Sequence, residues 1–430
     1  MVLHRRAVAI RVTLVMCICI VVVVASVLAH SVSARSQQGL RPRSASNQAS
    51  GVCTSWYVSP GQNPSPQDSR FADVAAISSS DIWAVGSYYM AGVTAYQTLF
   101  EHFNGATWSV VPSSNAGSVD NHLQKLAVVS STDIWAVGSS QSTRANYSTL
   151  IEHWDGTQWS IVPSPNGIDP SVENNYLTGV AAVAADDVWA VGYYESVATS
   201  TLYSSLIEHW DGTSWTIVDS PAVGSLVTVP TAVTAIAAND VWVVGHYANA
   251  GSEVTAPLFE NWNGTSWTVV PAANTGWEDS EPQAVTAVSA SDIWAVGHGG
   301  LTGSFSDQSL AEHWNGTAWS VVPSPNVNSS PAFLLGVTSL GSNDVWAVGY
   351  YGVPSPIYRE PVIMRWNGSA WTIVTSPNLG TYSNLLSIIA LSPTSLWTVG
   401  WILAGTGQNQ PPQVLIEHYN PRIAIACGAP

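Results

Sequence analysis

The stretch that decides the fold is DIWAVG at residues 292–297, followed after a loop by LAEHWNGTAWSVV at residues 310–322. An apolar run, AVTAV at residues 284–288, precedes it. The tryptophan of the Asp-Ile/Val-Trp element recurs at Trp83, Trp135, Trp189, Trp242, Trp294, Trp346 and Trp397. Successive copies are 51 to 54 residues apart. A unit repeated at a nearly constant interval identifies a repeat protein, in which neighbouring units share a core.

Each unit contains four short segments rich in β-branched and aromatic residues and separated by turn residues. An Asn-Gly or Asp-Gly pair stands between the third and fourth segments, as at Asn315-Gly316, and tolerates the positive φ angles of a tight type I′ hairpin. Four antiparallel strands in a unit of this length are typical of a propeller blade. The sequence therefore predicts an all-β fold, a seven-bladed β-propeller of four-stranded antiparallel blades over residues 53–430.

The two ends of the domain resemble parts of one blade. TSWYVSP at residues 54–60 matches TSWTVVP at residues 265–271, which is a fourth strand, and the seventh unit loses the pattern after Asn420. We expect the N-terminal strand to complete the last blade and close the ring, which leaves no open sheet edge. Cys53 and Cys427 are the two cysteines beyond the hydrophobic leader. In an exported protein this pair predicts a disulfide.

The N-terminal region has a different composition. Three arginines precede residues 12–29, which are uncharged and mostly apolar, and small residues follow. Residues 1–34 are predicted to be a signal peptide or a membrane anchor, because the apolar run is long for the first and near the minimum for the second. Residues 35–52, rich in Ser, Gln and Arg, predict a flexible linker. Both alternatives export the domain, either secreted or tethered to the outer side of the cytoplasmic membrane.

The exported part is strongly acidic. Beyond residue 50 six basic residues face all 28 acidic ones, which gives a formal charge of −22. This charge excludes nucleic acid as a partner, since binding to phosphates needs a basic surface. It is compatible with a soluble extracellular domain, and we expect a monomer whose contact with a membrane is limited to the possible N-terminal anchor.

The repeat resembles the kelch repeat of the galactose-oxidase central domain, through the hydrophobic strand at 294–297, Trp314 and Trp319. It departs from kelch in having one glycine where that family has two. WDGTSW at residues 210–215 also looks like the Asp-box turn of sialidase-type propellers, and the Trp-Ala-Val-Gly element is similar to repeats of photosystem-assembly propellers. Each resemblance implies a propeller, but the fold implies no activity.

The motifs that suggest catalysis are all repeated. The Glu-His pair of the third segment recurs in five units, and strand alternation places its two side chains on opposite faces. The repeated Asp is expected to accept backbone N–H groups in the first hairpin turn, and the repeated tryptophans are expected to pack between blades. The copper site of galactose oxidase needs a cysteine crosslinked to a tyrosine, whereas Cys53 and Cys427 are expected to pair with each other. A sialidase needs clustered arginines, so neither chemistry is expected. The sequence predicts no catalytic residue, cofactor or metal, although a metal shared by His246 and His298 is left open.

The connections after the second and fourth segments are long, differ in every unit and belong to one rim of the ring, where binding sites are usually built. The predicted ligand-binding residues there are Tyr194, Tyr247, Trp277, Tyr350, Tyr351 and Trp401. The sequence favours an exported non-catalytic binding or scaffold protein that contacts a glycan, peptide or protein through this rim. The alternatives are an extracellular glycan-active hydrolase or lyase and an envelope-anchored assembly factor.

Overall fold

The structure is a computed structural model that describes residues 55–142, 146–167, 173–196, 203–252, 254–273, 275–300, 307–327, 330–354, 357–377, 382–403 and 410–421. The predicted leader and linker, and both Cys53 and Cys427, lie outside the described residues. No helix within these described ranges is long and apolar enough to cross a membrane.

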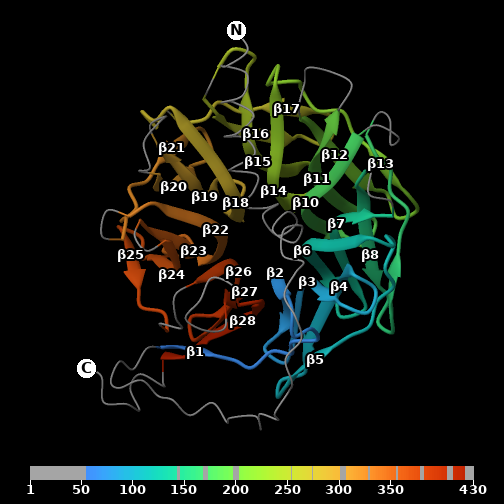
Figure 1. Ribbon diagram of the computed structural model, residues 1–430. Helices are drawn as coiled ribbons and strands as arrows, with labels where there is room; N and C mark the ends of the chain where they lie inside the picture. Colours follow the sequence, from blue (N-terminus) through green and yellow to red (C-terminus); the bar gives the residue numbers. More distant parts are fainter. Residues whose placement is uncertain are drawn as a thin grey trace. The chain divides into compact units, whose positions relative to one another are not determined.

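The described chain forms seven four-stranded antiparallel sheets arranged in a ring (Figure 1), as the sequence predicted. The first three blades contain β2 (Ser69–Ser78), β3 (Asp81–Met90), β4 (Ala95–Phe103) and β5 (Trp108–Val110); β6 (Asp120–Ser130), β7 (Asp133–Gln141), β8 (Ser148–Trp154) and β9 (Trp159–Ile161); β10 (Glu173–Ala184), β11 (Asp187–Ser196), β12 (Ser204–Trp210) and β13 (Trp215–Ile217). The next three contain β14 (Val227–Ala237), β15 (Asp240–Ala248), β16 (Ala256–Trp262) and β17 (Trp267–Val269); β18 (Asp279–Ser289), β19 (Asp292–Gly300), β20 (Gln308–Trp314) and β21 (Trp319–Val321); β22 (Ala332–Gly341), β23 (Asp344–Pro354), β24 (Ile357–Trp366) and β25 (Trp371–Val374).

The seventh blade joins the two ends of the domain. It contains β26 (Ser383–Ser392), β27 (Ser395–Leu403), β28 (Pro412–Tyr419) and β1 (Trp56–Val58), in the order β1-β28-β27-β26. Trp56 pairs with Tyr419 in antiparallel register, and the Asn420 N–H donates to the Ser55 carbonyl at 2.7 Å. The predicted closure by the N-terminal strand is confirmed. It gives the last blade its fourth strand.

The first and second strands of each blade are longer than the sequence indicated. In blade 4, β14 and β15 remain paired beyond Gly245, as far as Val227 opposite Ala248. The glycine is needed because a Cβ at Gly245 would overlap the carbonyl oxygen of Val229 on the neighbouring strand. Several aromatic residues predicted to follow the second strand therefore lie within it: Tyr194, Tyr247, Tyr350, Tyr351 and Trp401.

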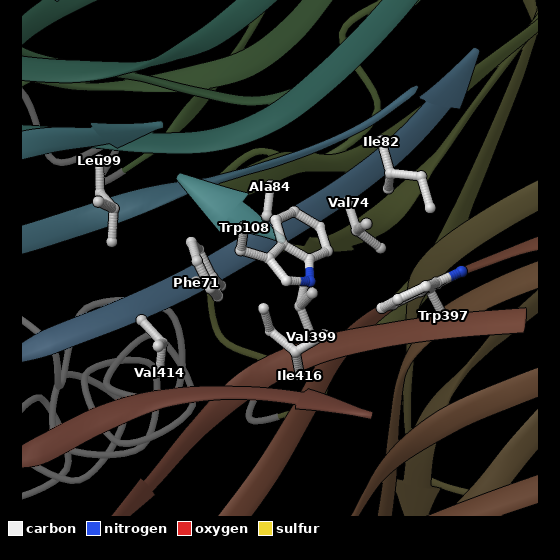
Figure 2. Packing of buried hydrophobic residues seen from close by; sticks show 10 residues of the cluster. All are labelled: Phe71, Val74, Ile82, Ala84, Leu99, Trp108, Trp397, Val399, Val414 and Ile416. Atoms are coloured by element: carbon white, nitrogen blue, oxygen red, sulfur yellow. The ribbon is translucent and has the colours of Figure 1, made fainter. Parts of the chain in front are cut away.

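The hydrophobic core is divided among the interfaces between blades, as expected for a ring of stacked units. Trp83 of blade 1 packs on Trp154 and Trp159 of blade 2, with ring centroids 4.9 and 5.5 Å apart, and the same contacts recur around the ring. At the closure, Trp397 packs on Trp108 at 5.7 Å. Figure 2 shows this interface between blades 7 and 1, where both tryptophans lie among aliphatic side chains. The predicted packing role of the repeated tryptophans is confirmed at these positions.

The repeated Asp has a different partner from the one expected. Asp81 accepts from Nε2 of His102 in the third strand at 2.8 Å, rather than from backbone N–H groups of its own turn. The same bond recurs in blades 2, 3 and 5, and Arg365 donates to Asp344 in blade 6. Asp81 begins β3, and His102 lies one residue before the end of β4, which pairs with β3 in antiparallel register, so the repeated His links the second and third strands of the blade.

Candidate functional site

The long connections share one rim of the ring, and the residues at the base of this rim differ from blade to blade. We define the rim ring as the cross-strand pair that lies just beyond the second-strand glycine of each blade. Its members are Arg70 and Ser87, His122 and Ser139, Tyr176 and Tyr193, Val229 and His246, Glu281 and His298, Phe333 and Tyr350, and Asn384 and Trp401. Repeated packing positions hold the same residue type in most blades, so this variation is not required by the fold.

Blades 6, 7 and 1 form the arginine–aromatic sector of the rim ring. The Arg359 guanidinium lies 4.4 Å from the ring centroid of Tyr350 and 5.6 Å from that of Tyr382. Tyr382 stacks on Trp401 with centroids 5.8 Å apart and an interplanar angle of 25°. The Arg70 guanidinium lies 4.9 Å from the Trp401 ring. These rings and guanidinium groups therefore form a continuous row of contacts across two blade interfaces, stabilised in part by cation–π attraction.

Hydrogen bonds with neighbouring residues fix the position of the Arg70 side chain. Its guanidinium donates to both carboxylate oxygens of Asp68 at 2.8 and 2.9 Å, and the Tyr96 hydroxyl donates to Asp68 at 3.0 Å. Burial raises the pKa of Asp68 and of Tyr96 above their ordinary values, and Arg70 opposes this effect. His122 of blade 2 contacts the Tyr96 ring and, because it is buried and near Arg70, has a pKa lowered to about 4.

Two further sectors complete the ring. In blades 2 and 3, the rings of Tyr147, Tyr176, Tyr193 and Tyr203 form a chain with successive centroids 5.1–5.6 Å apart. This chain contains no described basic side chain and presents mainly aromatic surface.

The histidine sector, in blades 4 to 6, contains buried ionisable groups. The Glu281 carboxylate accepts from the Thr255 hydroxyl at 3.1 Å and lies 4.0 Å from Nε2 of His298. Nδ1 of His298 and Nδ1 of His246 have no hydrogen-bond partner among the described residues. Burial lowers the pKa of His298, while Glu281 acts in the opposite direction. No group of three or more His, Cys, Asp or Glu side chains in the described residues is placed to hold a metal ion.

The first strands line the central channel, as predicted, and enclose a cavity of about 140 Å³. Its walls are mostly Gly, Ala and Val, and the charged groups among its lining residues are Asp73 and Lys125. These two form an ion pair at 3.2 Å, and Asp73 also accepts the backbone N–H of Leu126 at 2.8 Å. The acid therefore links blade 1 to blade 2. An ion pair in an otherwise apolar cavity offers few groups to orient a ligand.

The six predicted ligand-binding residues do not form one cluster in the structure. Tyr350 and Trp401 belong to the arginine–aromatic sector, and Tyr350 is only 2% exposed. Tyr351 points to the other face of its strand and donates to Glu360, and burial raises its pKa to about 12. Tyr194 and Trp277 each cover a glycine of their own blade, since a Cβ added at Gly167 or Gly299 would meet their rings at 2.7 Å. Tyr247 is half-buried in β15.

The prediction missed Arg70, Arg359 and Tyr382, which connect the sector. Arginine is rare in this domain, and this rarity was the signal that could have found them. These arginines are not clustered in the sequence, and a single binding site departs from the repeat.

The sequence matches no protein-family model and no curated protein. Among solved structures, it is similar to YCF48 bound to D1 peptide, with a TM-score of 0.51 and 15% identity over 85% of this chain and 97% of that chain. It is also similar to the polysaccharide lyase Uly1, with a TM-score of 0.47 and 9% identity over 87% and 94% of the two chains. It is similar, too, to a protein of unknown function from Dyadobacter fermentans DSM 18053, with a TM-score of 0.46 and 11% identity over 68% of this chain and 93% of that chain. The shared feature is the propeller fold, and the kelch-like resemblance stays a prediction.

Proposed function

We propose that this protein is an exported, non-catalytic β-propeller that binds a ligand through its long-loop rim. The arginine–aromatic sector is the observation that supports this proposal. Tyr382 and Trp401 are half-buried and stacked side by side, and they occupy positions that the other blades fill with other residue types. Packing of the repeated core does not require them there.

The blades supply a rigid frame for such a site. Interlocked tryptophans and the closed ring hold β24 of blade 6 and β26 of blade 7 in place, and Arg359 and Tyr382 pair directly across that interface. A site built on sheet strands loses little conformational freedom on binding, so more of the contact energy becomes affinity.

Binding can be tested with the full-length protein on an array of glycans and peptides. A peptide arm is included because YCF48 is a propeller that was solved with a bound peptide. Trp401→Ala should weaken binding of any captured ligand by about 10-fold or more, since loss of a buried aromatic contact costs about 2 kcal/mol at a binding hot spot. Trp210→Ala is the control, because it removes a half-buried tryptophan from the opposite rim. Equal losses in both variants, matched by equal loss of folded protein, would contradict a site on the long-loop rim.

A second candidate function, a glycan-active enzyme, is favoured by the histidine sector. A buried imidazole beside a carboxylate is a common acid–base arrangement, and His298 and Glu281 have that relationship. The test is release of new reducing ends or unsaturated ends from a panel of polysaccharides. Product that forms with the native protein and disappears with His298→Asn would support catalysis. Absence of product across the panel would leave binding as the function.

A further inference from the structure

The lysine and arginine side chains that the structure describes have unlike surroundings. Arg70, Lys125 and Arg365 each contact a carboxylate, at nitrogen–oxygen distances of 2.8, 3.2 and 2.8 Å. Arg359 has no carboxylate partner among the described residues, although acidic residues greatly outnumber basic ones in this domain. Its guanidinium lies instead over the rings of Tyr350 and Tyr382.

This environment leaves the hydrogen-bonding groups of Arg359 available. A cation–π contact uses the face of the aromatic ring and satisfies none of the guanidinium N–H donors. The rings hold the side chain, which is half-buried at the base of the long-loop rim. A guanidinium presented in this way matches a carboxylate, which can accept two parallel N–H groups from the planar fork. Arg359 is therefore suited to an anionic group supplied by a ligand.

The neighbouring surface indicates what carries that anionic group. Tyr382 contacts the Arg359 guanidinium on one side and stacks on Trp401 on the other, with an interplanar angle of 25°. The exposed parts of these two half-buried rings form an apolar surface beside the guanidinium, which suits the C–H groups of a sugar better than the polar backbone of an extended peptide. We propose that this sector binds an acidic glycan, with a uronate carboxylate on Arg359 and sugar C–H groups against the exposed parts of Tyr382 and Trp401. This inference rests on the proposed binding function of the rim.

Calorimetric titration of the full-length protein with three probes tests the proposal. The probes are oligogalacturonate, the same oligosaccharide with its carboxylates methyl-esterified, and oligoglutamate. Oligogalacturonate should bind more tightly than the esterified probe, because only its carboxylates can form a charge-assisted contact with Arg359. Arg359→Gln should weaken it by about 10- to 100-fold, since a hydrogen bond to a charged group is worth that much. Arg365→Gln is the matched control, because it removes an equal charge at a position already paired with Asp344.

Each outcome separates this inference from the broader proposal. Binding of oligogalacturonate that needs Arg359, but not Arg365, supports the acidic-glycan site. If the esterified probe binds as tightly as oligogalacturonate, or if Arg359→Gln binds as tightly as the native protein, the proposed carboxylate contact is wrong. The effect of Trp401→Ala then still tests whether the ligand binds at the rim. Preferential binding of oligoglutamate overturns the glycan class. If none of the three probes binds, the acidic-glycan inference is wrong. A different ligand from the array, whose binding is lost in Trp401→Ala, would still support binding through the long-loop rim.

Discussion

The backbone N–H of Gln62 donates to both carboxylate oxygens of Glu101, at 3.1 and 3.0 Å. Gln62 lies six residues after Trp56, in the segment that leaves the fourth strand of blade 7, and Glu101 lies in the third strand of blade 1. The bond therefore joins neighbouring blades. Ala273, six residues after Trp267, is near Glu312: burial raises the pKa of this carboxyl, and the Ala273 backbone partly opposes the rise.

The repeated glutamate is fully buried in every blade that has it, and proline removes its partner in several of them. The glutamates are Glu101, Glu152, Glu208, Glu260, Glu312 and Glu417. Proline has no N–H to donate. At the sequence position equivalent to Gln62, six residues after the fourth-strand tryptophan, proline precedes the blades of Glu208, Glu260 and Glu417, as Pro165, Pro221 and Pro377. Blade 6, where Pro325 is at that position, has Met364 in place of the glutamate. We infer that the buried carboxylate stabilises the fold where an N–H donates to it and destabilises the fold where no donor is present.

Glu208→Met and Glu101→Met should have opposite effects on stability. The first copies blade 6 and removes a buried carboxylate with no described partner, so we expect about 1–3 kcal/mol of stabilisation at pH 8. The second leaves the Gln62 N–H unpaired and should destabilise by about 1–3 kcal/mol. Urea unfolding of both variants measures the difference. Destabilisation of similar size in both would show that the proline does not set the cost of the glutamate.

Stability should depend on pH through the same glutamates. Burial raises the pKa of Glu101 and Glu260 to about 7, and that of Glu152, Glu312 and Glu417 to about 8. The folded state then holds protons that the unfolded chain releases from about pH 4.5 upward. The contribution of these glutamates to the stability of the fold is complete below about pH 4.5 and is lost as pH rises through about 7 to 8. Melting curves should therefore show a higher Tm at pH 5 than at pH 8, and a Tm that rises continuously between these values would contradict this prediction.

Ring closure should depend on a single tryptophan. Trp56 is 1% exposed and packs on Tyr419 and Trp346, with centroids 5.3 and 6.1 Å away. Trp56→Ala should cost about 3–5 kcal/mol, as is usual for truncating a buried tryptophan. Trp277→Ala, in a long connection, is the matched control and should cost much less. Denaturant unfolding compares them, and equal losses would argue against a special role for the N-terminal strand.

Cys53 and Cys427 are predicted to form a disulfide in the oxidised protein. Both lie outside the described residues, but Ser55 and Asn420, two and seven positions away, are joined by a backbone hydrogen bond. The bridge would stabilise the closed ring by about 2–4 kcal/mol, as is typical for a disulfide. Peptide mapping of a nonreduced digest by mass spectrometry should reveal the linked pair. Two peptides that alkylate as free thiols would refute it.

The fold could be predicted from the sequence because the same physical requirements recur in every blade. The tryptophan spacing and the N-terminal TSWYVSP strand each indicated the correct topology. The Asn-Gly pair indicated the hairpin between the third and fourth strands, but its turn is not the predicted type I′: four residues separate Trp314 from Trp319, and among them only Gly316 has a positive φ. The candidate site could be predicted only in part. Its rim followed from loop length, but the contacts of Arg359 with Tyr350 and Tyr382 join blades 6 and 7 through side-chain directions that no linear pattern encodes. The extended pairing of β14 with β15 was missed because polar residues in these segments resemble loops.

The most direct measurement is a crystal structure of the full-length protein with bound oligogalacturonate. We expect sugar density in contact with the exposed parts of Tyr382 and Trp401, with a carboxylate within about 3 Å of the Arg359 guanidinium nitrogens. Density at the short-turn rim or in the channel beside Lys125, with the arginine–aromatic sector empty, would contradict it.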